Sequence, residues 1–150
     1  SEAFSLADQV AVMRGGVIEQ LAAPELLVAQ PKSPEVADFL RLGCVVPVER
    51  YNDAYRITRT DIRIDPASAP EAAAHVLLPS RSVRSVPLHD AAIPATVLRS
   101  QFRGDGHLTT VRIGDQNAGH ELTYLDAIRL SPGVPVGIAI DPGQLRWFSK

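Results

Sequence analysis

The chain has 150 residues, of which 45% are hydrophobic and 21% are charged, and its formal net charge is -2. This composition excludes wholesale disorder, and no run reaches the roughly 18 apolar residues of a membrane-spanning helix. The charge gives no general attraction to nucleic acid, and aromatic residues make up only 5%, too few for a base-stacking platform, so we expect no nucleic-acid partner.

The first elements predicted along the chain are a short helix and a hairpin. Residues 2–7 are compatible with a helix, and residues 10–13 and 17–19 are short apolar runs typical of strands. Between the two runs, Arg14-Gly15-Gly16 predicts a tight turn, because glycine adopts at little steric cost the positive φ values that hairpin turns require.

Two more helices are predicted before residue 43. The first begins at Pro24, which suits a first helical turn, and ends before Pro31. The second has Ser33 as its N-cap, and its apolar face is formed by Val36, Ala37, Phe39 and Leu40. These 43 residues hold too little apolar surface for an independent core, so we expect them to pack on another part of a protein.

From residue 44 onward the pattern is that of a β domain. Residues 65–74, rich in Pro, Ala and Ser, are predicted to form a long loop or a short helix within it. Many short strands separated by turn residues favour a barrel or a sandwich. Nine runs have strand-like composition: Val45–Glu49, Tyr55–Thr58, Val76–Leu78, Ser82–Val86, Ala95–Phe102, Thr109–Ile113, Glu121–Tyr124, Val134–Ile140 and Arg146–Phe148.

The first 40 residues carry a specific series of motifs. Residues 2–13 (EAFSLADQVAVM) are followed in order by Gly16, Ile18, Glu19-Gln20, Pro24-Glu25, Pro31, Ser33-Pro34 and Val36-Ala37-Asp38-Phe39-Leu40. This ungapped series closely resembles the end of the ATP-binding subunit of ABC-type importers, where it begins just after the switch-loop histidine.

The remainder resembles the transport-associated OB-like (TOBE) domain of those subunits. Leu78–Val83 stands where that family has an Arg-Pro-Glu-type strand, Phe102–Asp105 at its aromatic-x-Gly turn, and Asp141–Phe148 at its closing strand. The resemblance implies a mainly β fold with an OB-like β-barrel (TOBE) domain over residues 44–150. Residues 1–43 would then be a helical and hairpin tail, the C-terminal remnant of an α/β ATPase domain.

The motif that cradles nucleotide phosphates, G-x-x-x-x-G-K-[ST], does not occur in these 150 residues. Gly15-Gly16 and Gly104-Asp105-Gly106 are predicted to be hairpin turns instead. On the resemblance, the signature motif, the Mg²⁺-side carboxylate and the switch histidine lie upstream. We therefore expect this segment to have no catalytic residue, no cofactor and no ATPase activity of its own, whereas its parent chain would bind ATP and Mg²⁺ and hydrolyse ATP.

Other chemistry has weaker support. The four histidines, at positions 75, 89, 107 and 120, share no motif with metal-ligand spacing, so no metal site is predicted. Cys44, next to two valines, is predicted to be a small buried hydrophobe. A stand-alone enzyme is disfavoured because no nucleophile–base pair is visible.

The resemblance leaves two functional hypotheses. In the first, the β domain is a regulatory and dimerising module that keeps two ATP-binding domains at high local concentration. Candidate contact residues are Val134, Val136 and Trp147, for which core packing is the alternative. Homodimerisation, permease subunits and a solute-binding protein are the implied partners, and the implied location is cytoplasmic, peripheral to the cell membrane.

In the second hypothesis, the barrel senses a small ligand, an oxyanion or the transported solute, and inhibits the transporter. Arg81, Arg99 and Arg103 are the candidate anion-binding residues, with Arg84 and Arg112 as further members of the set. Arginine forks suit tetrahedral oxyanions, while a solvated strand face is the alternative for these side chains.

Overall fold

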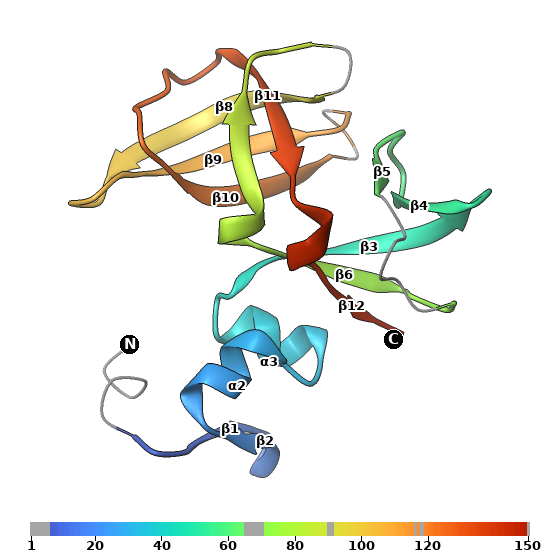
Figure 1. Cartoon of the computed structure of the whole chain (residues 1–150), viewed down its shortest axis with the longest axis vertical. Coiled ribbons are helices and arrows are strands. Elements are labelled where there is room, and N and C mark those ends of the chain that lie inside the picture. Colours follow the sequence, from blue (N-terminus) through green and yellow to red (C-terminus); the bar gives the residue numbers. More distant parts are fainter. Residues whose placement is uncertain (1–6, 65–70, 90–91, 116, 118, 150) are drawn as a thin grey trace. The chain divides into compact units, whose positions relative to one another are not determined.

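The structure, a computed structural model, describes residues 7–64, 71–89, 92–115, 117 and 119–149. The chain forms two compact units, Ser1–Leu42 and Gly43–Lys150 (Figure 1). In the described part of the chain, no helix combines the length and the apolar character needed to cross a membrane.

The first unit begins with an antiparallel hairpin. Strands β1 (Val10–Arg14) and β2 (Val17–Ala22) are joined by Gly15 and Gly16. The two glycines have φ values of 59° and 81°, which is the pattern of a type I′ turn, so the predicted hairpin is confirmed. The helix expected over residues 2–7 falls almost wholly outside the described residues.

Two six-residue helices follow, α2 (Pro24–Ala29) and α3 (Pro34–Phe39). Each has its proline in the first turn, as predicted. The Ser33 side chain accepts a hydrogen bond from the Val36 backbone N–H at 3.2 Å, which confirms Ser33 as the N-cap of α3. The capping bond satisfies one of the N–H groups that a helix leaves without an internal partner.

The predicted apolar face of α3 needs one correction. Val36 and Ala37 are buried and Leu40 packs against the same small core, but Phe39 is 69% exposed. Successive helical residues are about 100° apart around the axis, so Phe39 lies outside the arc that Val36, Ala37 and Leu40 cover. Among the described residues of this unit, Val12, Ala22, Leu27 and Val36 form a buried hydrophobic cluster.

The second unit contains two five-stranded antiparallel sheets within its described residues. Their strand orders are β10-β9-β8-β11-β7 and β12-β6-β3-β4-β5. All nine predicted strands are present, and the structure adds the two-residue strand β5, which is too short to show a periodic pattern. The strands are β3 (Gly43–Tyr51), β4 (Ala54–Ile57), β5 (Arg63–Ile64), β6 (His75–Pro79), β7 (Val83–Val86), β8 (Ile93–Phe102), β9 (His107–Ile113), β10 (His120–Asp126), β11 (Pro135–Ile140) and β12 (Arg146–Phe148).

The first of these sheets curls so that its two outer strands meet. The Ser85 hydroxyl on β7 reaches the Tyr124 hydroxyl on β10 at 2.6 Å, although the two strands stand at opposite ends of the strand order. Both sheets contribute to one hydrophobic core, in which Ile57 of the second sheet and Val111 of the first are fully buried. The prediction of a mainly β chain with an OB-like barrel behind a helical and hairpin tail is confirmed.

Short 3₁₀ turns border the barrel strands. Ser80–Ser82 precedes β7, and Pro142–Gln144 connects β11 to β12. Of the long loop predicted over residues 65–74, residues 65–70 lie outside the described residues.

Candidate anion-binding site

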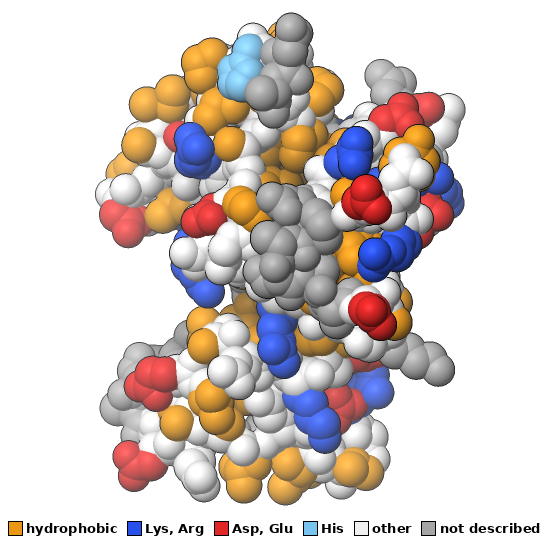
Figure 2. Space-filling model, turned by 45° about the vertical axis from the view of Figure 1, so that its right-hand side comes forward, with side chains coloured by type: hydrophobic (Ala, Val, Ile, Leu, Met, Phe, Trp, Pro, Cys, Tyr) orange, Lys and Arg blue, Asp and Glu red, His pale blue; other side chains and the backbone are white. Residues whose placement is uncertain are grey.

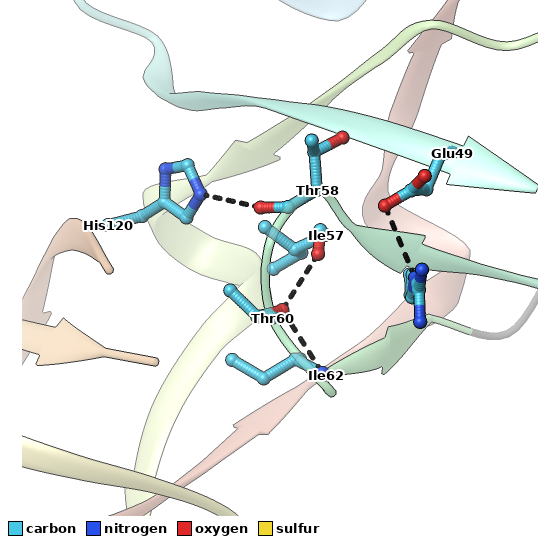
Figure 3. A network of polar contacts seen from close by, with 7 residues as sticks. Glu49, Ile57, Thr58, Thr60, Ile62 and His120 are labelled. Carbon is cyan, nitrogen blue, oxygen red and sulfur yellow. Dashed lines mark hydrogen bonds and ion pairs between the residues drawn. The ribbon is translucent and has the colours of Figure 1, made fainter. Parts of the chain in front are cut away.

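The turn between β4 and β5 is held by a network of hydrogen bonds (Figure 3). The Thr60 hydroxyl donates to the Ile57 carbonyl at 2.8 Å and accepts from the Ile62 backbone N–H at 3.1 Å. The Thr60 backbone N–H also donates to the Ile57 carbonyl, at 3.0 Å. These bonds close the turn around Arg59, whose φ of 64° lies in the left-handed region that residues other than glycine seldom adopt.

The same turn is fixed to the other sheet. The His120 ring nitrogen Nε2 lies 3.5 Å from the Thr58 carbonyl oxygen (Figure 3). Gly114, directly after β9, has φ of 80°, and a β-carbon there would lie 3.0 Å from the Thr60 methyl group. Glycine therefore allows the Thr60 side chain to approach the end of β9 closely.

Beside this turn lies a cleft of about 950 Å³, which we call the arginine cleft. The β4–β5 segment forms one wall, β8 with the start of β11 forms a second, and the end of β9 forms a third. The residues that line it are Arg56, Arg59, Thr60, Asp61, Ile62, Arg63, Leu88, Ala92, Ile93, Pro94, Ala95, Thr96, Arg112, Gly114, Asp115 and Pro135.

Two of the four arginines in the cleft are held by acidic side chains outside its lining. Arg56 Nε lies 3.2 Å from Glu49 Oε1, and the Arg56 guanidinium lies 4.4 Å from the centre of the Tyr51 ring. Arg112 Nη2 lies 3.7 Å from Glu121 Oε2. These partners orient the two guanidinium groups without occupying the cleft.

The other two arginines of the lining are Arg59 and Arg63. Among the described residues, neither Arg59 nor Arg63 forms an ion pair with an acidic side chain. The lining contains four arginines and two aspartates, Asp61 and Asp115, and the glutamates that pair with Arg56 and Arg112 offset two of the four positive charges. The guanidinium groups of Arg59 and Arg63 are the ones whose donor geometry suits an anion.

The arginines predicted from the sequence to bind an anion have three separate partners. Arg81 Nε donates to Gln144 Oε1 at 2.9 Å, Arg99 Nη2 lies 3.9 Å from Glu121 Oε1, and Arg103 Nη2 donates to Gln101 Oε1 at 3.1 Å. None of the three is among the described residues that line the arginine cleft. Of the wider set, Arg112 alone lines it.

Sequence reasoning overlooked Arg56, Arg59 and Arg63. The sequence feature that could have indicated this cleft is the run of three arginines, spaced three and four residues apart, at the predicted strand Tyr55–Thr58 and the turn after it. The alternation of side chains along a strand does not predict that these three arginines share one face of the sheet, because the turn reverses the chain between them.

The three predicted interface residues differ in their surroundings. Val134, just before β11, is 41% exposed, whereas Val136 packs against the hydrophobic core. Trp147 also packs against the core, and its ring centre lies 5.1 Å from that of Tyr55. Of the three side chains, Val134 is the one that the unit leaves largely accessible.

His107 and Cys44 have contacts within the β domain. Among the described residues, no three His, Cys, Asp or Glu side chains are grouped in a way that could hold a metal ion. The His107 ring packs against Phe102 at a tilted angle of 59°, with ring centres 5.5 Å apart. Cys44, half-buried on β3, donates its thiol hydrogen to the Glu121 carbonyl at 3.0 Å, which links the two sheets.

Comparison with known proteins gives a consistent result. No family model matches the chain. A protein named Fe(3+) ions import ATP-binding protein FbpC, from Streptomyces coelicolor, is 34% identical over 147 residues, which make up 96% of this chain and 40% of the relative. A protein named spermidine/putrescine import ATP-binding protein PotA, from Trichodesmium erythraeum, is 42% identical over 65 residues, 40% of this chain and 16% of the relative.

A third relative extends the series. A protein named sulfate/thiosulfate import ATP-binding protein CysA, from Brucella melitensis, is 27% identical over 113 residues, 75% of this chain and 32% of the relative. The chain thus spans well under half the length of these relatives. Several import ATP-binding proteins match in this way, and the chain is similar over most of its length to part of the ATP-binding subunits of ABC-type importers.

Proposed function

We propose that these 150 residues are the C-terminal portion of the ATP-binding subunit of an ABC importer, with Gly43–Lys150 as its regulatory TOBE domain. The observation that carries the proposal is the 34% identity over nearly the whole chain to an import ATP-binding protein of which the match covers only 40%. The part of that relative that lies outside the match would hold the phosphate-binding loop, whose motif these 150 residues do not contain.

The surface of the first unit supports this proposal. Met13, Ile18 and Leu21 on the hairpin are 54%, 53% and 54% exposed. Hydrophobic side chains gather on the surface of this unit in the lower part of Figure 2. A free-standing unit with so small a described core and this much exposed apolar surface is not expected to be stable, whereas an ATPase domain that covers the hairpin would bury that surface.

In the parent chain, the β domain would act as a dimerising and regulatory module. Two copies in contact would keep two ATP-binding domains close together between cycles of ATP hydrolysis. Permease subunits and a solute-binding protein would be the further partners, and the subunit would lie in the cytoplasm at the membrane face of the transporter. The names of the relatives give cargoes as different as ferric ions, polyamines and sulfate, so the proposal is restricted to their shared role in import.

The mass and activity of the native polypeptide test the proposal. We expect the source cells to make a polypeptide more than twice as long as 150 residues that binds and hydrolyses ATP, while the purified 150-residue chain has no ATPase activity. A native product of 150 residues, or ATP hydrolysis by the purified chain, would contradict it. Sedimentation of the full-length subunit tests the dimerisation separately, and a monomer at high micromolar concentration would contradict that role.

A further inference from the structure

We propose that the arginine cleft binds a small organic anion with an aliphatic body, such as an alkyl carboxylate. The proposal concerns the Gly43–Lys150 unit alone and does not depend on the transport role proposed above. It begins from the basic wall, where Arg59 and Arg63 lack acidic partners among the described residues, and where Arg56 is fixed by Glu49.

The geometry of the basic wall is set before any ligand arrives. The Thr60 hydroxyl and backbone bonds hold the turn, the contact between Gly114 and Thr60 places it against β9, and His120 reaches the Thr58 carbonyl (Figure 3). Arg59 has a left-handed backbone, which persists only where the surroundings determine it. A preorganised turn reduces the ordering cost of binding, because fewer groups lose conformational freedom when the ligand arrives.

The opposite wall has a different chemistry. Pro94 on β8 and Pro135 on β11 are exposed apolar residues of the lining, and the lining residue Leu88 is 55% exposed. Removing apolar surface from water stabilises a complex. A ligand with an aliphatic body gains this contribution, and its anionic group reaches the arginines across the cleft.

The size and lining of the cleft favour an alkyl carboxylate over a simple oxyanion as its ligand. A volume of about 950 Å³ is at the upper end of the roughly 300–1,000 Å³ typical of small-molecule sites, and a tetrahedral oxyanion would leave most of it filled with water. None of the described lining residues is aromatic, so the cleft has no platform for stacking a nucleobase. The carboxylate group matches the two-pronged geometry of a guanidinium.

Titration of the ¹⁵N-labelled 150-residue chain with octanoate tests the site. We expect saturable chemical-shift changes at residues 56–63, 93–96 and 112–115, with a dissociation constant below about 1 mM. The double variant Arg59→Gln/Arg63→Gln is expected to bind octanoate at least about tenfold more weakly, a loss of about 1.4 kcal/mol. The emission of Trp147, the single tryptophan, reports whether each variant remains folded.

The matched control is Arg81→Gln/Arg103→Gln, which removes the same charge outside the cleft and is expected to change the affinity less than about twofold. Acetate, inorganic phosphate and 1-octanol test the two halves of the ligand, and each is expected to bind much more weakly than octanoate. The proposal is overturned if both double variants weaken octanoate binding equally, or if phosphate or octanol binds as tightly as octanoate. It is also overturned if the chemical-shift changes are confined to the β1–β2 hairpin, or if octanoate shows no saturable binding. None of these outcomes bears on the mass or ATPase activity of the native subunit.

Discussion

The hydroxyl groups of Ser85 and Tyr124 lie 2.6 Å apart and join the two outer strands of the curled sheet. The Ser85 hydroxyl also lies 2.6 Å from the Asp126 carboxylate, so Ser85 is the shared partner of Tyr124 and Asp126. Tyr124 is fully buried. Burial raises the pKa of Tyr124 above its ordinary value of 10.0, the hydrogen bond to Ser85 partly opposes the rise, and the Asp126 charge adds to it.

This contact predicts a loss of stability in alkali. Because the pKa of Tyr124 is raised in the folded state, its contribution is fully present below the unfolded pKa, near 10, and is lost as pH rises through the folded pKa. Tyr124→Phe is expected to remove this part of the pH dependence. Urea unfolding of both proteins between about pH 8 and pH 11 checks it, and a constant difference in the free energy of unfolding across that range would contradict it.

Trp147→Ala is expected to destabilise the second unit by about 2–3 kcal/mol, because the substitution removes a ring that packs on Tyr55 and on the core. Phe102→Ala is the control, since Phe102 is 70% exposed and its loss is expected to change stability by less than about 0.5 kcal/mol. Urea unfolding followed by circular dichroism measures both. Equal effects in the two variants would show that Trp147 is not a core residue.

Gly43→Ala is expected to destabilise the second unit by about 2 kcal/mol or more, because a β-carbon would collide with the Leu78 carbonyl oxygen and lie 2.7 Å from the Pro79 α-carbon. Both contacts are with backbone, which cannot rotate away. Gly143→Ala is the matched control, since a β-carbon there would meet only Asp141 Oδ1, at 3.4 Å. Trp147 emission follows both unfolding transitions, and an unaffected Gly43→Ala variant would show that β3 and β6 separate easily at this point.

Glu121→Gln is expected to lower stability by no more than about 1 kcal/mol, even though two arginines share this carboxylate. Glu121 and its partner Arg99 have side chains 49% and 59% exposed, and the Arg99 distance of 3.9 Å is long, so solvent screens the pairs. Thermal unfolding at low and high salt measures the effect. A loss above 2 kcal/mol that disappears in high salt would assign the pairs a larger structural role.

Much of the architecture could be predicted from local patterns. The Gly15-Gly16 turn, the Ser33 cap and the nine strand runs each depend on residues next to one another in the sequence. Phe39 was predicted to be buried because its position was assigned to an apolar face without the geometry of the short helix. Strand β5 was missed because two residues cannot display a period.

The candidate site could not be predicted in the same way, because its walls come from distant parts of the sequence. Arg63 and Arg112 line one cleft although 49 positions separate them, and the contact between Thr60 and Gly114 that positions its basic wall depends on how the two sheets meet. The sequence does supply the arginines. Sheet register decides which arginines line the cleft and which contact a glutamate or glutamine outside it.

The position of β11 has a consequence for synthesis of the protein. This strand is close to the end of the chain, yet it lies between β8 and β7 and provides the backbone ladder that connects them. The last strand, β12, likewise pairs with the much earlier β6. A ribosome must therefore translate past Ile140 before β7 can join its sheet. In a nascent chain cut short before Pro135, β7 and β8 each lack β11 as a partner and keep an open edge, so we expect such a chain to be a target for chaperones and proteases.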